Sequence, residues 1–249
     1  MKKKLLFAAA LIIIAANAIA KEGVYIEFKL SGGKFSGTSK TYSSDGNTRS
    51  EMSMISPSLP APINTVTLVL SNALHMIYTI NEKDKTYSEM SSDGKSVQKE
   101  GEGDYEVTVV GKEMVNNYNS IHVKVRYKSS KHETEMWLSK DVVGWANYTS
   151  VRNQYLTGSK LFEAMKAKGA EGFVVRMLVN GAGENIQMDL VKAEKKSLDE
   201  SLFSLGGYTK TARTPVFGSM DMEALKKMTP EERQQYIKEM QAKYKQQQH

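Results

Sequence analysis

The stretch IHVKVRYKSSKHETEMWL, residues 121–138, decides the fold, because it has the pattern of one β-hairpin with two different faces. Apolar and polar residues alternate along both halves, as in antiparallel strands that bury one face. With the Ser-Ser pair as the turn, Lys124 faces Glu135 on one side. On the other side, Val123 faces Met136. A slip of one residue would exchange the two faces, so the register is strongly specified.

Two more hairpins are expected in the same sheet. Residues 173–179 and 184–193 flank the turn sequence NGAG, and residues 37–43 and 48–54 flank an Asp-Gly pair, which is a strong hairpin signal. The expected neighbours are Phe173, Val175 and Met177 beside Leu190, Met188 and Ile186, Arg176 near Asp189, and Lys40 opposite Glu51. The inner face around the Asp-Gly turn carries Ser39, Thr41, Ser50, Met52 and Met54. Such small and soft side chains fill a core poorly, so space for a ligand is expected there.

Further strands and one helix complete the predicted domain. The strand pattern recurs at residues 24–30, 65–70, 75–80, 86–90 and 105–110. Residues 160–168 predict a helix, with Ser159 as its N-cap and Gly169 as its left-handed stop. The sequence therefore predicts an α+β fold, in which a short helix packs across one face of a mostly antiparallel sheet.

The first 20 residues have the three parts of a secretory signal peptide. Three lysines precede an apolar run at residues 5–16, and the segment ends on Ala-Ile-Ala. A retained membrane anchor is the alternative, but the run is shorter than the roughly 20 apolar residues that span a bilayer. Cleavage is expected after Ala20, which leaves an exported protein, periplasmic or secreted, with no integral membrane span. The sequence has no cysteine, so it is not expected to be a lipoprotein.

The mature chain is expected to divide into a sheet domain, residues 21–211, and a linker with a helical tail, residues 212–249. In the tail, Thr229, Pro230 and Glu232 have the spacing of a capping box with proline at the first helical position. An apolar stripe then recurs at four-residue intervals, formed by Tyr236, Met240 and Tyr244. This stripe is a candidate surface for an envelope protein partner.

Composition and motifs indicate neither catalysis nor nucleic-acid binding. The formal net charge of +6 includes three leader lysines, so the mature chain carries about +3, without a dense basic stripe. Three Ser-x-x-Lys matches lack the companion motifs of a nucleophile. The four histidines, which have no metal-ligand spacing, are His75, His122, His132 and His249. A non-enzymatic protein without a metal or cofactor is therefore expected.

The 14 methionines are the most distinctive compositional feature. Methionine is flexible and polarizable, which suits a surface that adapts to varied apolar ligands, although ordinary core filling is the alternative. The candidate ligand cavity consists of Met52, Met54, Met76, Tyr78, Met136, Phe162, Met165, Met177 and Met188.

Five stretches carry a resemblance to a known family: GTSKTYSSDGNTRSEM (37–52), YTINEKDKTYSEM (78–90), YEVTVVGKEMVNNYNSIHVKV (105–125), TEMWLSKDV (134–142) and DLVKAEKKSLDESLF (189–203). Together they resemble the exported bacterial family called domain of unknown function 4412. That name implies no activity and no catalytic residues.

The alternating strands, the Asp-Gly hairpin and MWLSKD (136–141) also resemble the periplasmic lipoprotein-carrier and lipoprotein-localisation fold. This second resemblance implies a curved, unclosed half-barrel with helices across its concave apolar side. A lipid-like or other hydrophobic ligand would lie between the sheet and the helix at residues 159–169. The leading hypothesis is a ligand carrier, and the alternative is a scaffold module that acts through its tail.

Overall fold

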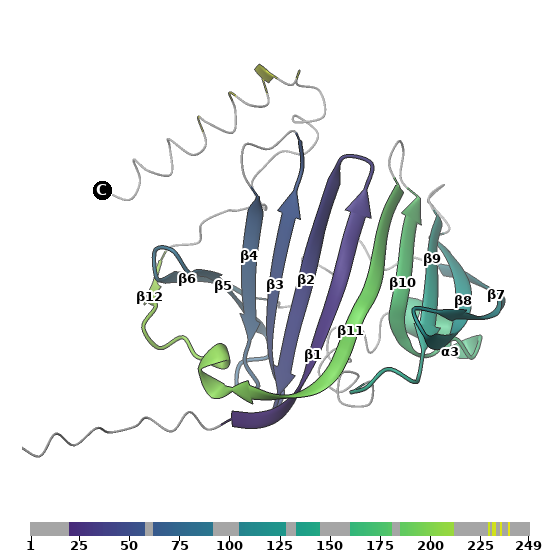
Figure 1. Ribbon diagram of the computed structural model, residues 1–249, viewed down its shortest axis with the longest axis horizontal. Helices are drawn as coiled ribbons and strands as arrows, with labels where there is room; N and C mark the ends of the chain where they lie inside the picture. The colour runs from purple at the N-terminus through teal and green to yellow at the C-terminus, as the bar shows by residue number, and fades with distance from the viewer. Residues whose placement is uncertain are drawn as a thin grey trace, which may run out of the picture.

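The computed structural model describes residues 20–57, 62–91, 105–127, 133–144, 160–180 and 185–211, together with residues 229, 231, 232, 235 and 239. These residues form one 12-stranded sheet, in the order β12-β6-β5-β4-β3-β2-β1-β11-β10-β9-β8-β7 (Figure 1). The strands are β1 (Ala20–Gly32), β2 (Phe35–Ser44), β3 (Asn47–Ile55), β4 (Ile63–Val69), β5 (Met76–Asn81), β6 (Thr86–Ser91), β7 (Tyr105–Val115), β8 (Tyr118–Tyr127), β9 (Glu133–Ser139), β10 (Phe173–Asn180), β11 (Asn185–Asp199) and β12 (Thr209–Lys210).

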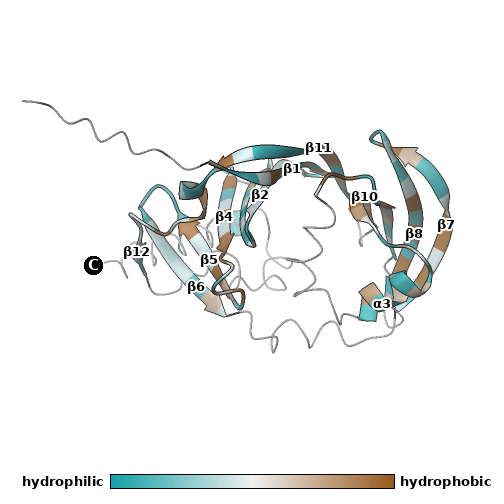
Figure 2. Cartoon of the chain, turned by 90° about the horizontal axis from the view of Figure 1, so that it is seen from below, coloured by the Kyte–Doolittle hydropathy of each residue, from teal (hydrophilic) through white to brown (hydrophobic). Residues whose placement is uncertain are grey.

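All neighbouring strands run antiparallel except the short edge strand β12, which pairs parallel to β6. The sheet stays open, with β12 at one edge and β7 at the other. Figure 2 shows that it bends into an arch, with the helix α3 (Lys160–Ala167) on the inner side. The predicted fold class, an unclosed and mostly antiparallel sheet with a short helix on one face, is therefore confirmed.

Bulges contribute to this bend in the half of the sheet between β1 and β7. The register shifts at Glu27/Phe28 in the β1–β11 pair, at Val174/Arg176 in the β10–β9 pair and at Val109/Gly111 in the β7–β8 pair. An extra residue on one strand bends that strand and increases its twist. The alternating pattern of the sequence does not reveal these positions.

The register of two predicted hairpins is confirmed. Lys124 pairs with Glu135, Val123 pairs with Met136, and Lys40 pairs with Glu51. The turn after β2 uses Asp45 and Gly46 at φ of 50° and 78°. Both residues of a type I′ turn need positive φ, which explains why the Asp-Gly pair located this turn correctly.

The predicted register of the third hairpin is wrong by two residues. Met177 pairs with Met188 rather than lying beside Ile186, and Arg176 lies directly opposite Asp189. The two strands extend to Asn180 and Asn185, so the connection is displaced by one residue from the predicted NGAG turn. A shift of two residues leaves every side chain on its predicted face.

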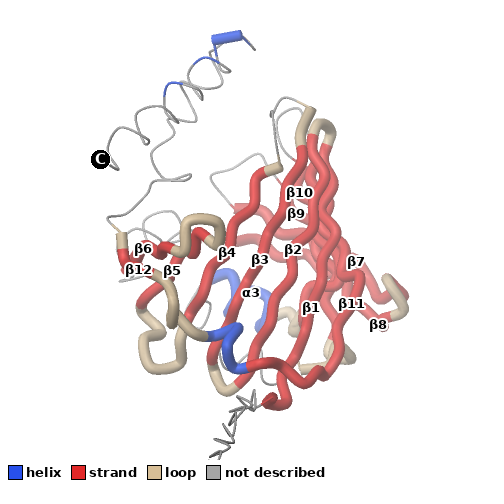
Figure 3. Tube along the Cα trace, turned by 60° about the vertical axis from the view of Figure 1, so that its left-hand side comes forward, coloured by secondary structure: helices blue, strands red, loops and turns tan. Residues whose placement is uncertain are grey.

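Three apolar clusters hold the sheet together. One joins β1, β10 and β11 and includes Ile26, Phe28 and Leu190, with the Phe28 and Phe173 rings stacked at 5.8 Å. A second packs α3 against β7, β8 and β9. The third lies on the other face, where the segment around the short helix η1 (Glu200–Phe203) covers β4 to β6. Figure 3 shows η1 beside the lower end of β3.

The helix α3 ends as its sequence predicts. Gly169 has φ of 67°, and Ala170 N–H donates to the Met165 carbonyl at 2.9 Å. A glycine in this left-handed conformation is the usual stop of an α-helix. Its predicted N-cap, Ser159, lies outside the described residues.

Candidate ligand-binding surface

One continuous row of apolar residues crosses the inner side of the arch. Each member is the direct cross-strand partner of the next, which places their side chains on the same face. From β4 to β7 the row consists of Ile63, Met54, Gly37, Leu30, Met188, Met177, Met136, Val123 and Val109. We call these nine residues the apolar rung.

The apolar rung faces the concave side, because its member Val123 belongs to the cluster that packs against α3. The four methionines of the rung are neither fully buried nor fully exposed, unlike the core residues around them. Met136 packs against the α3 cluster and Met188 against the β1–β10–β11 cluster. The rung therefore crosses the gap between two core clusters and keeps apolar surface accessible.

A second row on the same face is hydroxylated. This row begins next to Ile26 of β1, and each of its members is the cross-strand partner of the next. From β2 to β6 the members are Thr41, Ser50, Thr67, Thr79 and Ser88. We call these five residues the hydroxyl rung. The hydroxyls of Thr41 and Ser50 lie 3.4 Å apart and hydrogen bond to each other. The concave face therefore has an apolar part and a neutral polar part side by side.

The structure brings together most of the cavity residues that the sequence predicted. Met54, Met136, Met177 and Met188 are members of the apolar rung, and Met52 lies two residues from Met54 on the same face. Met165 of α3 packs in the same cluster as Met136. Phe162 of α3 is half-buried.

Met76 and Tyr78 do not belong with them, and this part of the prediction needs correction. Tyr78 pairs with Leu68, which pairs with Arg49 on the convex face. There Met76 and Tyr78 pack beneath residues Phe203, Leu205 and Tyr208. The pairing register of β4 with β5 decides this, and no local pattern in the sequence specifies it.

The convex face is charged over its second half. Arg176 Nε donates to Asp189 Oδ1 at 2.6 Å, while Gln187 and Asn116 donate to the same carboxylate. Burial alone would raise the pKa of Asp189, but these hydrogen bonds outweigh it and lower the pKa below its ordinary value. His122 stacks on Trp137 at 4.1 Å and contacts Glu135 at 2.8 Å. The polar sides of neighbouring hairpins thus merge into one network.

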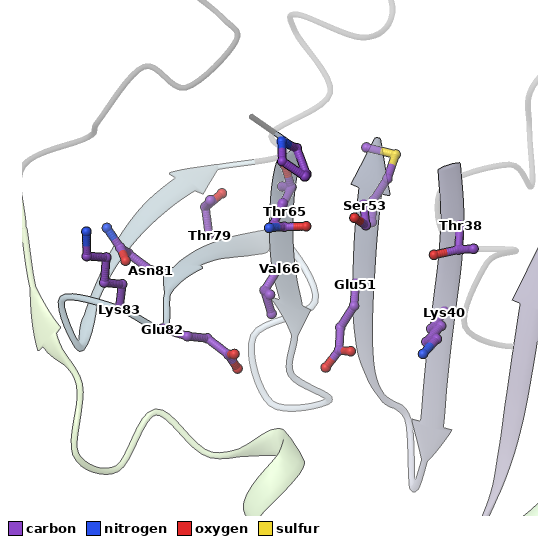
Figure 4. A pocket seen from close by; sticks show the side chains of 13 residues that line it. Thr38, Lys40, Glu51, Ser53, Thr65, Val66, Thr79, Asn81, Glu82 and Lys83 are labelled. Carbon is purple, nitrogen blue, oxygen red and sulfur yellow. The ribbon is translucent and has the colours of Figure 1, made fainter. Parts of the chain in front are cut away.

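A polar hollow of about 670 Å³ lies between β2 and β5, and its charged lining residues include Lys40, Glu51 and Glu82 (Figure 4). Sequence reasoning missed it. Arg49 is only 7% exposed and forms ion pairs with Glu51, at 2.7 Å, and with Glu82. The two carboxylates point toward each other across Val66 (Figure 4). Glu82 lies 33 residues from Arg49, so only the paired strands bring these charges together.

The described residues contain no group of three or more His, Asp or Glu side chains placed to hold a metal ion. His132 and His249 lie outside the described residues. Over the same part of the chain, no helix has the length and apolar character needed to cross a bilayer.

Only fragments of the predicted tail are described. Thr229 N–H donates to Glu232 at 2.7 Å, and Glu232 N–H donates to the Thr229 hydroxyl at 3.2 Å, as in a capping box. Tyr236, Met240 and Tyr244 lie outside the described residues, as does the leader up to residue 19. The helical tail, the domain division at residue 211 and leader cleavage therefore stay predictions.

An open antiparallel sheet with a helix inside its arch defines the class of unclosed half-barrels. Residues 22–207 match the family model described as Domain of unknown function (DUF4412), and the chain belongs to that family. No curated protein matches the chain significantly.

Several solved structures are similar at low identity. An uncharacterized conserved protein from Thermus thermophilus is 9% identical, with a TM-score of 0.44, over 76% of this chain and 90% of that chain. The MucA/MucB complex of Pseudomonas aeruginosa gives 12% identity and a TM-score of 0.40 over 75% of this chain, which spans only 56% of that chain. LprF from Mycobacterium bovis gives 12% identity and a TM-score of 0.32, over 67% of this chain and 83% of that chain. No function follows from likenesses at this level.

Proposed function

We propose that this protein is a non-enzymatic, exported envelope protein that binds a lipid-like amphiphile on its concave face. The observation that carries the proposal is the apolar rung beside the hydroxyl rung on one face. An acyl chain would lie along the methionines and Leu30, and a neutral polar headgroup would reach the hydroxyls around Ser50. On the convex face, the apolar residues of β4 and β5 are packed against Phe203, Leu205 and Tyr208 instead.

The expected affinity follows from the length of chain that the rung covers. Each methylene removed from water contributes about 0.8 kcal/mol, so eight of them contribute about 6 kcal/mol before the costs of association. Binding in the micromolar range would therefore need most of an acyl chain in contact with the rung. The flexible methionines let the same surface accommodate chains of different shape.

The direct test is uptake of a fluorescent fatty acid by delipidated full-length protein. We expect one molecule per chain, and we expect Met177→Glu to abolish uptake because it places a charge at the centre of the rung. Thr38→Glu is the matched control, since it adds the same charge at an exposed convex position. Failure of the wild-type protein to take up the probe, or equal loss in both variants, would contradict the proposal.

The capping-box contacts of Thr229 and Glu232 favour a second candidate function. In this alternative, the tail helix docks on an envelope protein through Tyr236, Met240 and Tyr244. Deletion of residues 212–249 separates the two functions. Amphiphile uptake should survive the deletion, whereas capture of an envelope partner by the intact chain should be lost.

A further inference from the structure

We propose that Met136, Met177 and Met188 form a binding site for a soft monovalent cation, Cu(I) or its analogue Ag(I). The three residues are direct cross-strand partners on the adjacent strands β9, β10 and β11. Thioether sulfur is a soft ligand that selects Cu(I), whereas it binds hard cations poorly. This inference does not depend on amphiphile binding, because it uses the sulfur atoms rather than the apolar surface.

The spacing of the strands allows the three sulfur atoms to reach one ion. Neighbouring strands lie about 4.8 Å apart, so the backbone of Met177 lies about that far from Met136 on one side and from Met188 on the other. The backbones of Met136 and Met188 are therefore about 10 Å apart. All three residues lie on the inner face of the sheet, and Figure 2 shows that this sheet bends into an arch. Each methionine has three rotatable bonds, so its sulfur can turn toward a shared centre.

The burial of the trio also fits a site rather than core filling. Met136 and Met188 pack against two different apolar clusters. Met177 lies between them in the sheet and is a member of neither cluster. All three side chains are half-buried, which leaves them accessible to an ion while apolar neighbours limit hydration. A fourth thioether, Met165 of α3, packs in the cluster of Met136 and can complete the coordination.

Apolar ligand binding uses the flexibility and the apolar surface of methionine, but it does not use the lone pairs of the sulfur. Leucine would offer a similar apolar volume at these positions, and Leu30 takes that role in the same rung. Three successive partners with sulfur therefore indicate that the sulfur is used. No His, Asp or Glu is a member of the rung to compete as a harder ligand.

The test is titration of the full-length protein with Ag(I), followed by native mass spectrometry, and anaerobic competition for Cu(I) against a chromophoric chelator. We expect one ion per chain and a sulfur-only first shell in X-ray absorption spectra. Met177→Leu should weaken binding by at least about tenfold. Loss of a residue that only supports a metal ligand already lowers metal affinity by about 10–100-fold, and Met177 would be a ligand itself. Leucine preserves volume, so thermal unfolding of the variant should match that of the wild type.

Met54→Leu is the matched control. It removes a thioether from the same rung but lies three strand spacings from Met188, or about 14 Å. The inference is wrong if the wild type binds no ion, or if Met54→Leu weakens binding as much as Met177→Leu. Fatty-acid uptake is measured separately on the same wild-type protein: uptake of the fatty acid without binding of the ion overturns this inference alone, and binding of the ion without uptake of the fatty acid overturns only the proposed function.

Discussion

Replacing Arg49 with methionine should destabilise the sheet more than any change to its two acidic partners. The Arg49 side chain is 7% exposed and is paired with Glu51 and Glu82, whose side chains are 33% and 52% exposed. Burial lowers the pKa of Arg49, but the hydrogen bonds to both carboxylates raise it above its ordinary value, so the guanidinium stays charged. Methionine keeps the apolar stem and removes only the charge and its donors.

The magnitude follows from what the substitution leaves behind. Removing one partner of a fully buried pair costs about 3–5 kcal/mol, because the other charge remains uncompensated. Here water reaches both carboxylates, so we expect about 2–3 kcal/mol. Glu82→Gln, which changes the more exposed partner, should cost under about 1 kcal/mol.

Urea denaturation followed by tryptophan fluorescence measures the free energy of unfolding of both variants. In thermal unfolding of a domain of this size, a loss of 2–3 kcal/mol corresponds to a decrease in Tm of about 4–12 °C. A loss for Arg49→Met no larger than that for Glu82→Gln would refute the reasoning. It would mean that Arg49 is hydrated in solution and that its two ion pairs contribute little.

Three further predictions follow from individual contacts. The folded protein holds the pKa of Asp189 below its value in the unfolded chain, so the ionised carboxylate stabilises the fold at neutral pH, and this contribution is lost as pH falls below about 4. Asp189→Asn should remove that loss of stability, and urea midpoints from pH 3 to 7 measure it. Phe28→Ala should cost about 3–5 kcal/mol in chemical denaturation, because the side chain is 9% exposed and stacks on Phe173. Gly37→Ala should lower Tm, since its Cβ would lie 2.3 Å from the Ser53 carbonyl oxygen; an unchanged Tm would show that the strand pair relaxes freely.

Local hairpins were the predictable part of this fold. Lys124 and Glu135, or Lys40 and Glu51, lie within 11 residues of each other, so the turn and the charge pattern together specify one register. The faces of each hairpin followed from alternation alone. Even the misplaced β10–β11 register kept Met177 and Met188 on the correct side, because an error of two residues preserves parity.

Long-range pairing was not predictable in the same way. Lys195 pairs with Glu22 across 173 residues of sequence, and no turn signal connects their strands. The misassignment of Met76 and Tyr78 has the same origin, since their face depends on pairing with β4 and on the cover supplied by residues after Glu200. The polar hollow likewise needs Glu82, which follows β5 and forms an ion pair with Arg49 of β3.

The β1–β11 pair therefore determines whether the concave surface exists at all. Local hairpins build the part of the apolar rung on β1 to β4, whereas the part on β7 to β11 also needs the long-range pairing of Met136 with Met177. The pairing of Leu30 with Met188 then joins the two parts into one row. The stacked rings of Phe28 and Phe173 and the buried Leu190 stabilise that junction. A continuous ligand surface therefore forms only when β1 has paired with β11. An amphiphile that spans both halves would then bind the assembled sheet and not its separate hairpins, and would stabilise the junction in proportion to its affinity.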